Sequence, residues 1–151
     1  MKILELGHVV LYVTNLERSV HFYRDVLGFP VVGEMKLGMK SGAVAFSTGR
    51  THHEMLLIEI GGEPRSPYKL EPGLYHIGLK VANSHDELKS VYEELKANNV
   101  PIIGMSDHSV THSIYIHDPD GNELELYADV SDEWKTNPSA VMAPIKPLNL
   151  D

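Results

Sequence analysis

The feature that most constrains this chain is an internal repeat. Residues 7–13 and 75–81 are both strand-like runs with a histidine near their start, and these histidines, His8 and His76, lie 68 positions apart. An amphipathic helical pattern follows each run, and three strand-like segments follow each helix. The repeat therefore predicts two modules, each built from one strand, one helix and three further strands.

Local signals place the predicted elements. Asn15 can cap the first helix, and Gly28 follows its last apolar residue, where helices commonly end in a left-handed turn. Residues 84–87 form a capping box before the second helix. The predicted helices cover 16–27 and 86–98, and the predicted strands cover about 4–13, 30–35, 42–47, 53–60, 74–81, 100–104, 112–117 and 122–128.

Both modules are expected to belong to one α+β domain that spans the whole chain. Module one covers 4–60, a Gly- and Pro-rich linker covers 61–73, and module two covers 74–130. The sheet of one such module leaves an edge and an apolar face uncovered, so we expect the paired βαβββ modules to form a curved, open, barrel-like sheet around a cleft. The tail over 131–151 has no clear period and is expected to wrap the surface or a partner chain.

Composition excludes several classes of protein. The chain has no cysteine, which rules out disulfides, thiolate metal ligands and cysteine catalysis. Its net charge of −8 disfavours binding to nucleic acid or to an anionic membrane. It shows neither the apolar run of a signal peptide nor a stretch long enough to cross a bilayer. The expectation is a cytoplasmic globular protein.

The chemistry of the repeat centres on His8, His76 and Glu125. Two imidazoles and one carboxylate form a ligand set for a divalent metal that keeps open coordination positions. A lone histidine on a strand is more often structural than a ligand, but two at equivalent positions of a repeat are harder to explain that way. Glu125 lies between apolar residues, and a buried carboxylate is costly unless it is paired or metal-bound. By strand alternation Glu123 could fill the same role.

The chain resembles the vicinal oxygen chelate superfamily over residues 4–130. This superfamily includes glyoxalase I, fosfomycin and bleomycin resistance proteins, and extradiol catechol dioxygenases. The resemblance implies that His8, His76 and Glu125 are the metal ligands. It rests on Gly7-His8-Val9, the helix Ser19-Val20-His21-Phe22-Tyr23-Arg24-Asp25-Val26-Leu27-Gly28-Phe29, Tyr75-His76-Ile77-Gly78 and Asp118-Pro119-Asp120-Gly121-Asn122-Glu123-Leu124-Glu125-Leu126-Tyr127.

Within the superfamily the chain is most similar to small single-domain extradiol dioxygenases. Such enzymes carry a tyrosine ten residues before the ligand glutamate, the place of Tyr115, and a histidine shortly before it, which is either His108 or His112 here. A further catalytic histidine matches His53, which His52 precedes. The resemblance implies an Fe(II) enzyme that cleaves a catechol-like diol with O2. His53 would accept a catechol proton, and Tyr115 and His108 would form hydrogen bonds to substrate or oxygen.

Two other functions compete with this hypothesis. Glyoxalase-I-like isomerases or lyases use a second glutamate, and Glu59 lies 51 residues after His8, close to the 49 between His76 and Glu125. Such a fourth ligand favours Ni(II), Co(II) or Zn(II). Mn(II) is a further candidate for the metal in place of Fe(II). A non-catalytic ligand-binding or resistance protein would lack the metal triad. The family also implies a homodimer.

Overall fold

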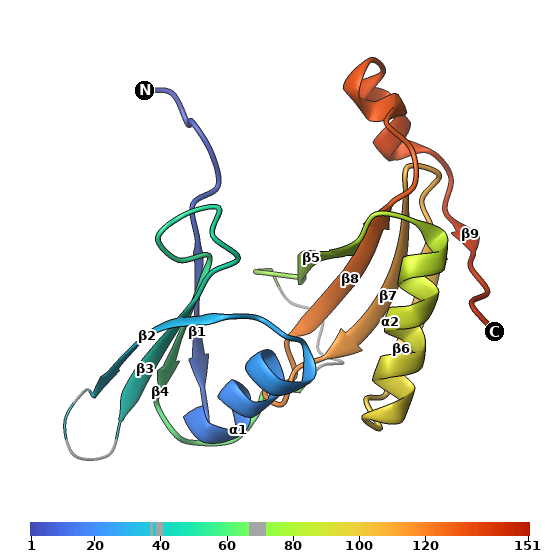
Figure 1. Ribbon diagram of the computed structural model, residues 1–151. Coiled ribbons are helices and arrows are strands. Elements are labelled where there is room, and N and C mark those ends of the chain that lie inside the picture. The colour runs from blue at the N-terminus through green and yellow to red at the C-terminus, as the bar shows by residue number, and fades with distance from the viewer. Residues whose placement is uncertain (37, 39–40, 67–71) are drawn as a thin grey trace. The chain divides into compact units, whose positions relative to one another are not determined.

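The computed structural model describes residues 1–36, 38, 41–66 and 72–151 (Figure 1). It divides into two compact units, residues 1–65 and 66–151. Part of the predicted linker lies outside the described residues. None of the described helices is long and apolar enough to cross a membrane.

Unit 1 contains one βαβββ module, as the repeat predicts. Its sheet has the strand order β1-β4-β3-β2, in which β1 pairs with β4 in parallel and the other neighbours are antiparallel. The sheet is open, with β1 and β2 at its edges. The elements are β1 (Val9–Val13), α1 (Leu16–Val20), the π-helix η1 (His21–Val26), β2 (Val31–Lys36), β3 (Gly42–Phe46) and β4 (Met55–Glu59).

Sequence signals fix the helical segment of unit 1. The side chain of Asn15 accepts a hydrogen bond from the backbone of Arg18 at 2.8 Å, which satisfies one free N–H of the first turn. Gly28 has a φ of 71°, so the predicted left-handed stop is confirmed. The predicted single helix is correct in extent, but its second half is π-helical. A wide turn of this kind was not visible in the apolar pattern.

Unit 2 repeats the module and adds the tail. Its open sheet has the order β5-β8-β7-β6-β9, with β5 parallel to β8 and the other neighbours antiparallel. The paired βαβββ modules of the predicted α+β fold are therefore confirmed. The elements are β5 (His76–Ala82), α2 (His85–Ala97), β6 (Ile102–Asp107), β7 (Thr111–His117), β8 (Glu123–Asp129), η2 (Glu133–Lys135), η3 (Pro138–Met142) and β9 (Lys146–Pro147).

The tail packs along one edge of the unit 2 sheet. β9 pairs with the end of β6, Leu150 is buried, and the hydroxyl of Tyr92 on α2 donates a hydrogen bond to Asp151 at 2.8 Å. These contacts hold the tail along the outer edge of the sheet and beside α2 (Figure 1). The tail thus wraps the surface of its own unit, one of the two outcomes expected from its composition.

Strand alternation gives the unit 2 sheet two different faces. One face carries buried apolar residues and packs against α2, and it includes Leu124 and Leu126 of β8. The other face carries the intervening residues of the same strand, Glu123, Glu125 and Tyr127, which are half-buried. Because neighbouring strands keep one register, polar residues of β5 and β7 join this second face.

Candidate functional site

The polar face of unit 2 brings together His76 and Glu125. In the β5–β8 register, His76 lies opposite Glu123 and Gly78 lies opposite Glu125. The Nε2 atom of His76 is 3.2 Å from Oε2 of Glu125, whereas its Nδ1 atom is 3.7 Å from Glu123. Both glutamates therefore reach the imidazole from one side of the sheet, and Glu125 is the closer of the two.

Tyr115 extends this contact into a hydrogen-bonded chain. It lies opposite Glu125 in the β7–β8 register, and its hydroxyl donates to Oε1 of Glu125 at 3.1 Å. The same hydroxyl lies 2.8 Å from Nε2 of His108. Since the phenol proton is given to Glu125, His108 must be the donor at Nε2. Burial, reinforced by Glu125, raises the pKa of Tyr115 to about 12, which keeps the phenol protonated.

Glycines on the neighbouring strands leave space around the hydrogen-bonded side chains of Glu125 and Tyr115. A Cβ atom at Gly78 would meet the ring of Tyr127 at 3.5 Å and Oε2 of Glu125 at 3.7 Å. A Cβ atom at Gly104, which lies opposite Tyr115, would meet the tyrosine ring at 3.7 Å. The two side chains at the centre of the site therefore lie beside strand positions with no side chain of their own.

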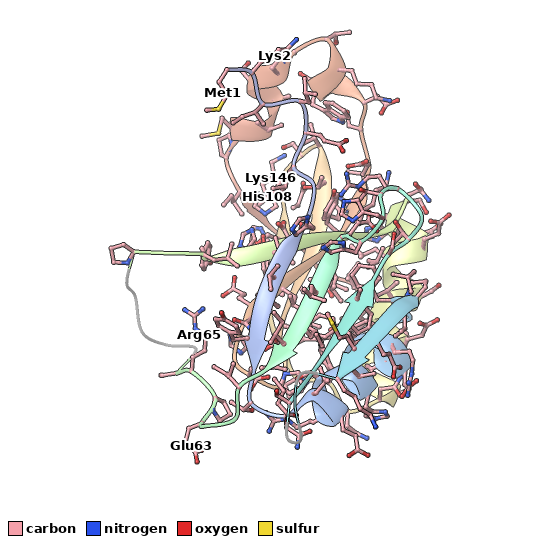
Figure 2. The ribbon with its side chains drawn as sticks, turned by 90° about the vertical axis from the view of Figure 1, so that its left-hand side faces the viewer. Met1, Lys2, Glu63, Arg65, His108 and Lys146 are labelled. Carbon is pink, nitrogen blue, oxygen red and sulfur yellow. The ribbon has the colours of Figure 1, made fainter. Side chains whose placement is uncertain are left out.

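The turn between β6 and β7 positions His108. Asp107 accepts a hydrogen bond at 2.6 Å from the backbone of Ser109, which has a φ of 68°. An aspartate two residues upstream commonly stabilises such a turn. Asp107 lies opposite Lys146 in the backbone register of β6 and β9. Figure 2 shows Lys146 and His108 next to one another. The tail strand therefore supports the turn that carries His108.

The structure distinguishes His108 from His112, which the sequence left open. Of these two histidines, His108 is the one that contacts Tyr115. His112 points to the helix face, where its Nδ1 lies 3.0 Å from Nδ1 of His85 and its Nε2 lies 3.7 Å from Asp107. Burial lowers the pKa of His112 from its ordinary value, and the charge of Asp107 opposes that shift.

Unit 1 gathers three histidines at one end of its sheet. Each of His8, His52 and His53 offers a ring nitrogen, and these three atoms all lie within 4.8 Å of one another. The rings of His8 and His53 have centroids 4.3 Å apart, and the Nδ1 atoms of His52 and His53 are 2.6 Å apart. Burial, followed by the charges of His8 and His52, lowers the pKa of His53, which favours its neutral form.

The structure does not bring Glu59 to this cluster. It pairs with Val13 at the far end of β1, five residues beyond His8, or roughly 16 Å along an extended strand. Its carboxylate accepts a hydrogen bond from the backbone of Leu16 at 2.6 Å, so it caps the helix. The similar spacing that suggested a fourth ligand is misleading, because the register makes Leu56 the counterpart of Glu125.

In the sequence, His52 is typical of a polar residue before a strand. Its membership of the cluster depends on the loop at 47–54, which turns the chain back toward His8. The adjacency of His52 to His53 was the one available signal, and neighbouring residues on an extended strand usually point to opposite faces. The loop removes that alternation.

The chain is similar in sequence to known proteins over most of its length. The profile of the Glyoxalase/Bleomycin resistance protein/Dioxygenase superfamily matches residues 5–126. The chain is 32% identical over 127 residues to the catechol-2,3-dioxygenase of Bacillus subtilis, covering 82% of this chain but 41% of that relative. It is 31% identical over 124 residues to the metallothiol transferase FosB of Staphylococcus haemolyticus, covering 81% of each.

Solved structures share the fold. The crystal structure of a glyoxylase/bleomycin resistance protein/dioxygenase domain from Frankia sp. EAN1pec has a TM-score of 0.68 and 18% sequence identity, covering 85% of this chain and 99% of that domain. At this level of identity the similarity concerns the fold and not the reaction.

Proposed function

Since the chain belongs to the Glyoxalase/Bleomycin resistance protein/Dioxygenase superfamily, we propose that it is a metal-dependent enzyme and, more specifically, an Fe(II)-dependent extradiol dioxygenase. Its substrates would be a catechol-like diol and O2. The proposed ligands are His8, His76 and Glu125. Members of the superfamily related to this chain include a dioxygenase and a metallothiol transferase, so the finer assignment depends on residues of the chain itself.

The residues of unit 2 fit a divalent metal. The 3.2 Å between His76 Nε2 and Glu125 Oε2 suits two ligands of one ion. Nδ1 of His76 is buried without a hydrogen-bond partner among the described residues, and the carboxylate nearest to it is Glu123. Metal-binding histidines commonly have a carboxylate on their other nitrogen, which orients the ring. When bound, Fe(II) supplies open positions for both oxygens of a diol and for O2.

The chain's own side chains supply the proton chemistry in this proposal. Tyr115 stays protonated at neutral pH and holds Oε1 of Glu125, which orients the carboxylate. His108 holds the tyrosine oxygen from the other side. His53, whose pKa is lowered, is neutral near pH 7 and can accept a proton from a substrate hydroxyl.

The observation that carries the dioxygenase proposal is the series of hydrogen-bond contacts that links His108, Tyr115 and Glu125. The extradiol resemblance implies that Tyr115 and His108 form hydrogen bonds to substrate or oxygen, and here these two side chains are linked to one another and to Glu125. A tyrosine hydroxyl used only for packing needs one partner. This hydroxyl contacts both His108 and Glu125, which are titratable groups.

Oxygen uptake by anaerobically Fe(II)-loaded protein, measured with a panel of catechols, tests the proposal. Metal-dependent uptake accompanied by a coloured ring-fission product is the expected result. Tyr115→Phe should reduce turnover while iron stays bound, and Tyr12→Phe, an exposed tyrosine on β1, serves as the matched control. Absence of uptake with every catechol by iron-loaded, folded protein would reject the dioxygenase assignment.

A metal-dependent thiol transferase is the second candidate. The observation that favours it is the 31% identity over 124 residues to the Staphylococcus haemolyticus transferase, which covers 81% of each chain. The chain spans only about two-fifths of the Bacillus subtilis dioxygenase. Metal-dependent transfer of a thiol to a second substrate, without oxygen uptake, would select this function. The isomerase alternative has lost its main support, since Glu59 caps a helix.

We also propose a homodimer. β1 and β5 are edge strands of their sheets, and exposed edges favour pairing with further strands. Sedimentation equilibrium of the metal-loaded chain measures its mass directly. A monomer at micromolar concentration would contradict this part of the proposal.

A further inference from the structure

The histidine cluster of unit 1 is complete without any residue of unit 2. We propose that His8, His52 and His53 form a metal site of their own, which binds a divalent transition-metal ion such as Zn(II), Ni(II) or Co(II). Nitrogens bound to one zinc ion at about 2.0–2.1 Å lie about 3.3–3.4 Å apart in a tetrahedron. The three ring nitrogens, all within 4.8 Å of one another, reach that spacing through small side-chain rotations.

The loop that carries His52 and His53 is held in place by its own hydrogen bonds. Ser47 donates its hydroxyl hydrogen to the carbonyl of Thr51 at 2.7 Å, and the backbone N–H of Gly49 donates to the oxygen of the same hydroxyl at 3.0 Å. Gly49 has a φ of 99°, which suits glycine alone. The loop conformation is therefore set before any ion binds.

Arg50 joins this loop to the segment before His8. Its guanidinium donates to the backbone carbonyls of Leu6 and Gly7 at 3.3 and 3.0 Å, and to the carboxylate of Glu54 at 2.9 Å. The backbone N–H of Val9 also donates to the carbonyl of Glu54 at 3.0 Å. Two segments that are far apart in the sequence are thus held together at the cluster. The three imidazoles are therefore preorganised.

Among the residues that the structure describes, the members of the cluster all offer imidazole nitrogens as ligands. Glu54, the nearest carboxylate in sequence, is occupied by the backbone and side chain of Thr48, at 2.6 and 2.7 Å, and by Arg50. Imidazole sites suit zinc, nickel and copper, whereas carboxylate-rich sites suit magnesium, calcium and manganese. The site is therefore expected to discriminate against Mg(II) and Ca(II).

This inference rests on the geometry of unit 1 and goes beyond the proposed enzyme function. His8 belongs both to the proposed catalytic ligand set and to the cluster, and His53 is both the proposed base and a member of the cluster, so an ion at the cluster competes with the catalytic roles of both residues. Removal of His76 and Glu125 disables one set and leaves every member of the other in place. The two proposals can therefore fail independently.

The test is binding of Co(II) and Zn(II) to the full-length His76→Asn/Glu125→Gln protein after metal removal. We expect one equivalent of Co(II), with the visible absorption of a tetrahedral nitrogen site. Adding His53→Gln or His52→Gln to this protein should weaken binding at least tenfold. Adding His21→Gln, which alters an exposed histidine on the helical segment of unit 1, should leave binding unchanged.

Circular dichroism and thermal melting establish that each variant is folded. Loss of all Co(II) binding in the folded double variant would overturn the inference, as would equal affinity with and without His53. Mg(II) in tenfold excess over Co(II) should not displace it, and displacement would also contradict an imidazole site. Failure of oxygen uptake by the wild-type protein would leave these results unaffected.

Discussion

The two units have the same fold and different chemistry at matching positions. In unit 2 the register aligns Gly78, Glu125 and Tyr115 across three strands. In unit 1 the corresponding positions on β1, β4 and β3 are occupied by Val10, Leu56 and Ala45, respectively. The duplicated backbone therefore fixes where a carboxylate, its tyrosine partner and the space for both can lie, and only one copy has the residues that use these positions.

Unit 1 places its polar groups elsewhere. The three histidines of its cluster lie just before β1 and in the loop before β4, and Arg50 links these two segments. A sheet position gives a side chain one direction fixed by strand alternation, whereas a loop can direct neighbouring side chains to one point. Repeat symmetry therefore predicts the location of a site carried by strands but not of a site carried by a loop.

Glu125→Gln should have the largest effect on this contrast. It replaces a charged ligand by a neutral one beside His76, so affinity for Fe(II) should fall by more than the about 10- to 100-fold typical of losing an outer hydrogen-bond partner. Metal titration of the apo protein measures this. Glu59→Gln is the matched control from unit 1, and a similar loss there would contradict its assignment as a helix cap.

Tyr115→Phe should have the second-largest effect, and on turnover rather than on metal content. Removing the hydroxyl breaks both hydrogen bonds and should lower kcat about 10- to 100-fold, the range for partners that orient a metal ligand. Because the pKa of Tyr115 is raised to about 12, the wild-type rate should show no loss from its ionisation below about pH 11. A break near pH 10 that Tyr115→Phe removes would contradict this assignment.

Gly78→Val should have an intermediate effect, since it imports the residue of unit 1. The Cβ atom alone makes ordinary contacts, but the methyl groups of valine would press on Tyr127 and on the Glu125 carboxylate. We expect roughly tenfold weaker metal binding, with a stability change within the about 1–3 kcal/mol of a local overpacking. Gly78→Ala is the matched control and should bind metal almost normally.

His112→Asn should have the smallest effect, on the pH dependence of stability. The folded state lowers the pKa of His112 through burial, so the unfolded state binds more protons near and below the ordinary histidine pKa. Its contribution to stability is therefore full above about pH 6.5 and is lost as the pH falls through the folded value. Thermal melts at pH 7.5 and 5.5 should show a smaller acid-induced drop for the variant, by a few degrees at most, because about 1 kcal/mol moves Tm by about 2–4 °C at this size. An unchanged drop would contradict a role for His112.

The sequence by itself determined the repeat and the elements within it. Apolar periodicity, the Asn15 cap and the Gly28 stop are local signals that depend on neighbouring residues alone, and the structure confirms them. Strand alternation placed Glu125 on the face opposite to Leu124 and Leu126. The ligand roles of His8, His76 and Glu125 remain predictions, because local sequence signals report backbone conformation and not the binding of an ion.

Only the tertiary structure decided which residues meet across strands and loops. Register showed that Leu56, and not Glu59, is the counterpart of Glu125, because loop lengths shift the two copies relative to one another. The β6–β7 turn selected His108 over His112 as the partner of Tyr115. The loop before β4 turned His52 toward His53 and His8. These contacts depend on backbone pairing between distant segments, whereas a sequence pattern reports only the periodicity of one segment at a time.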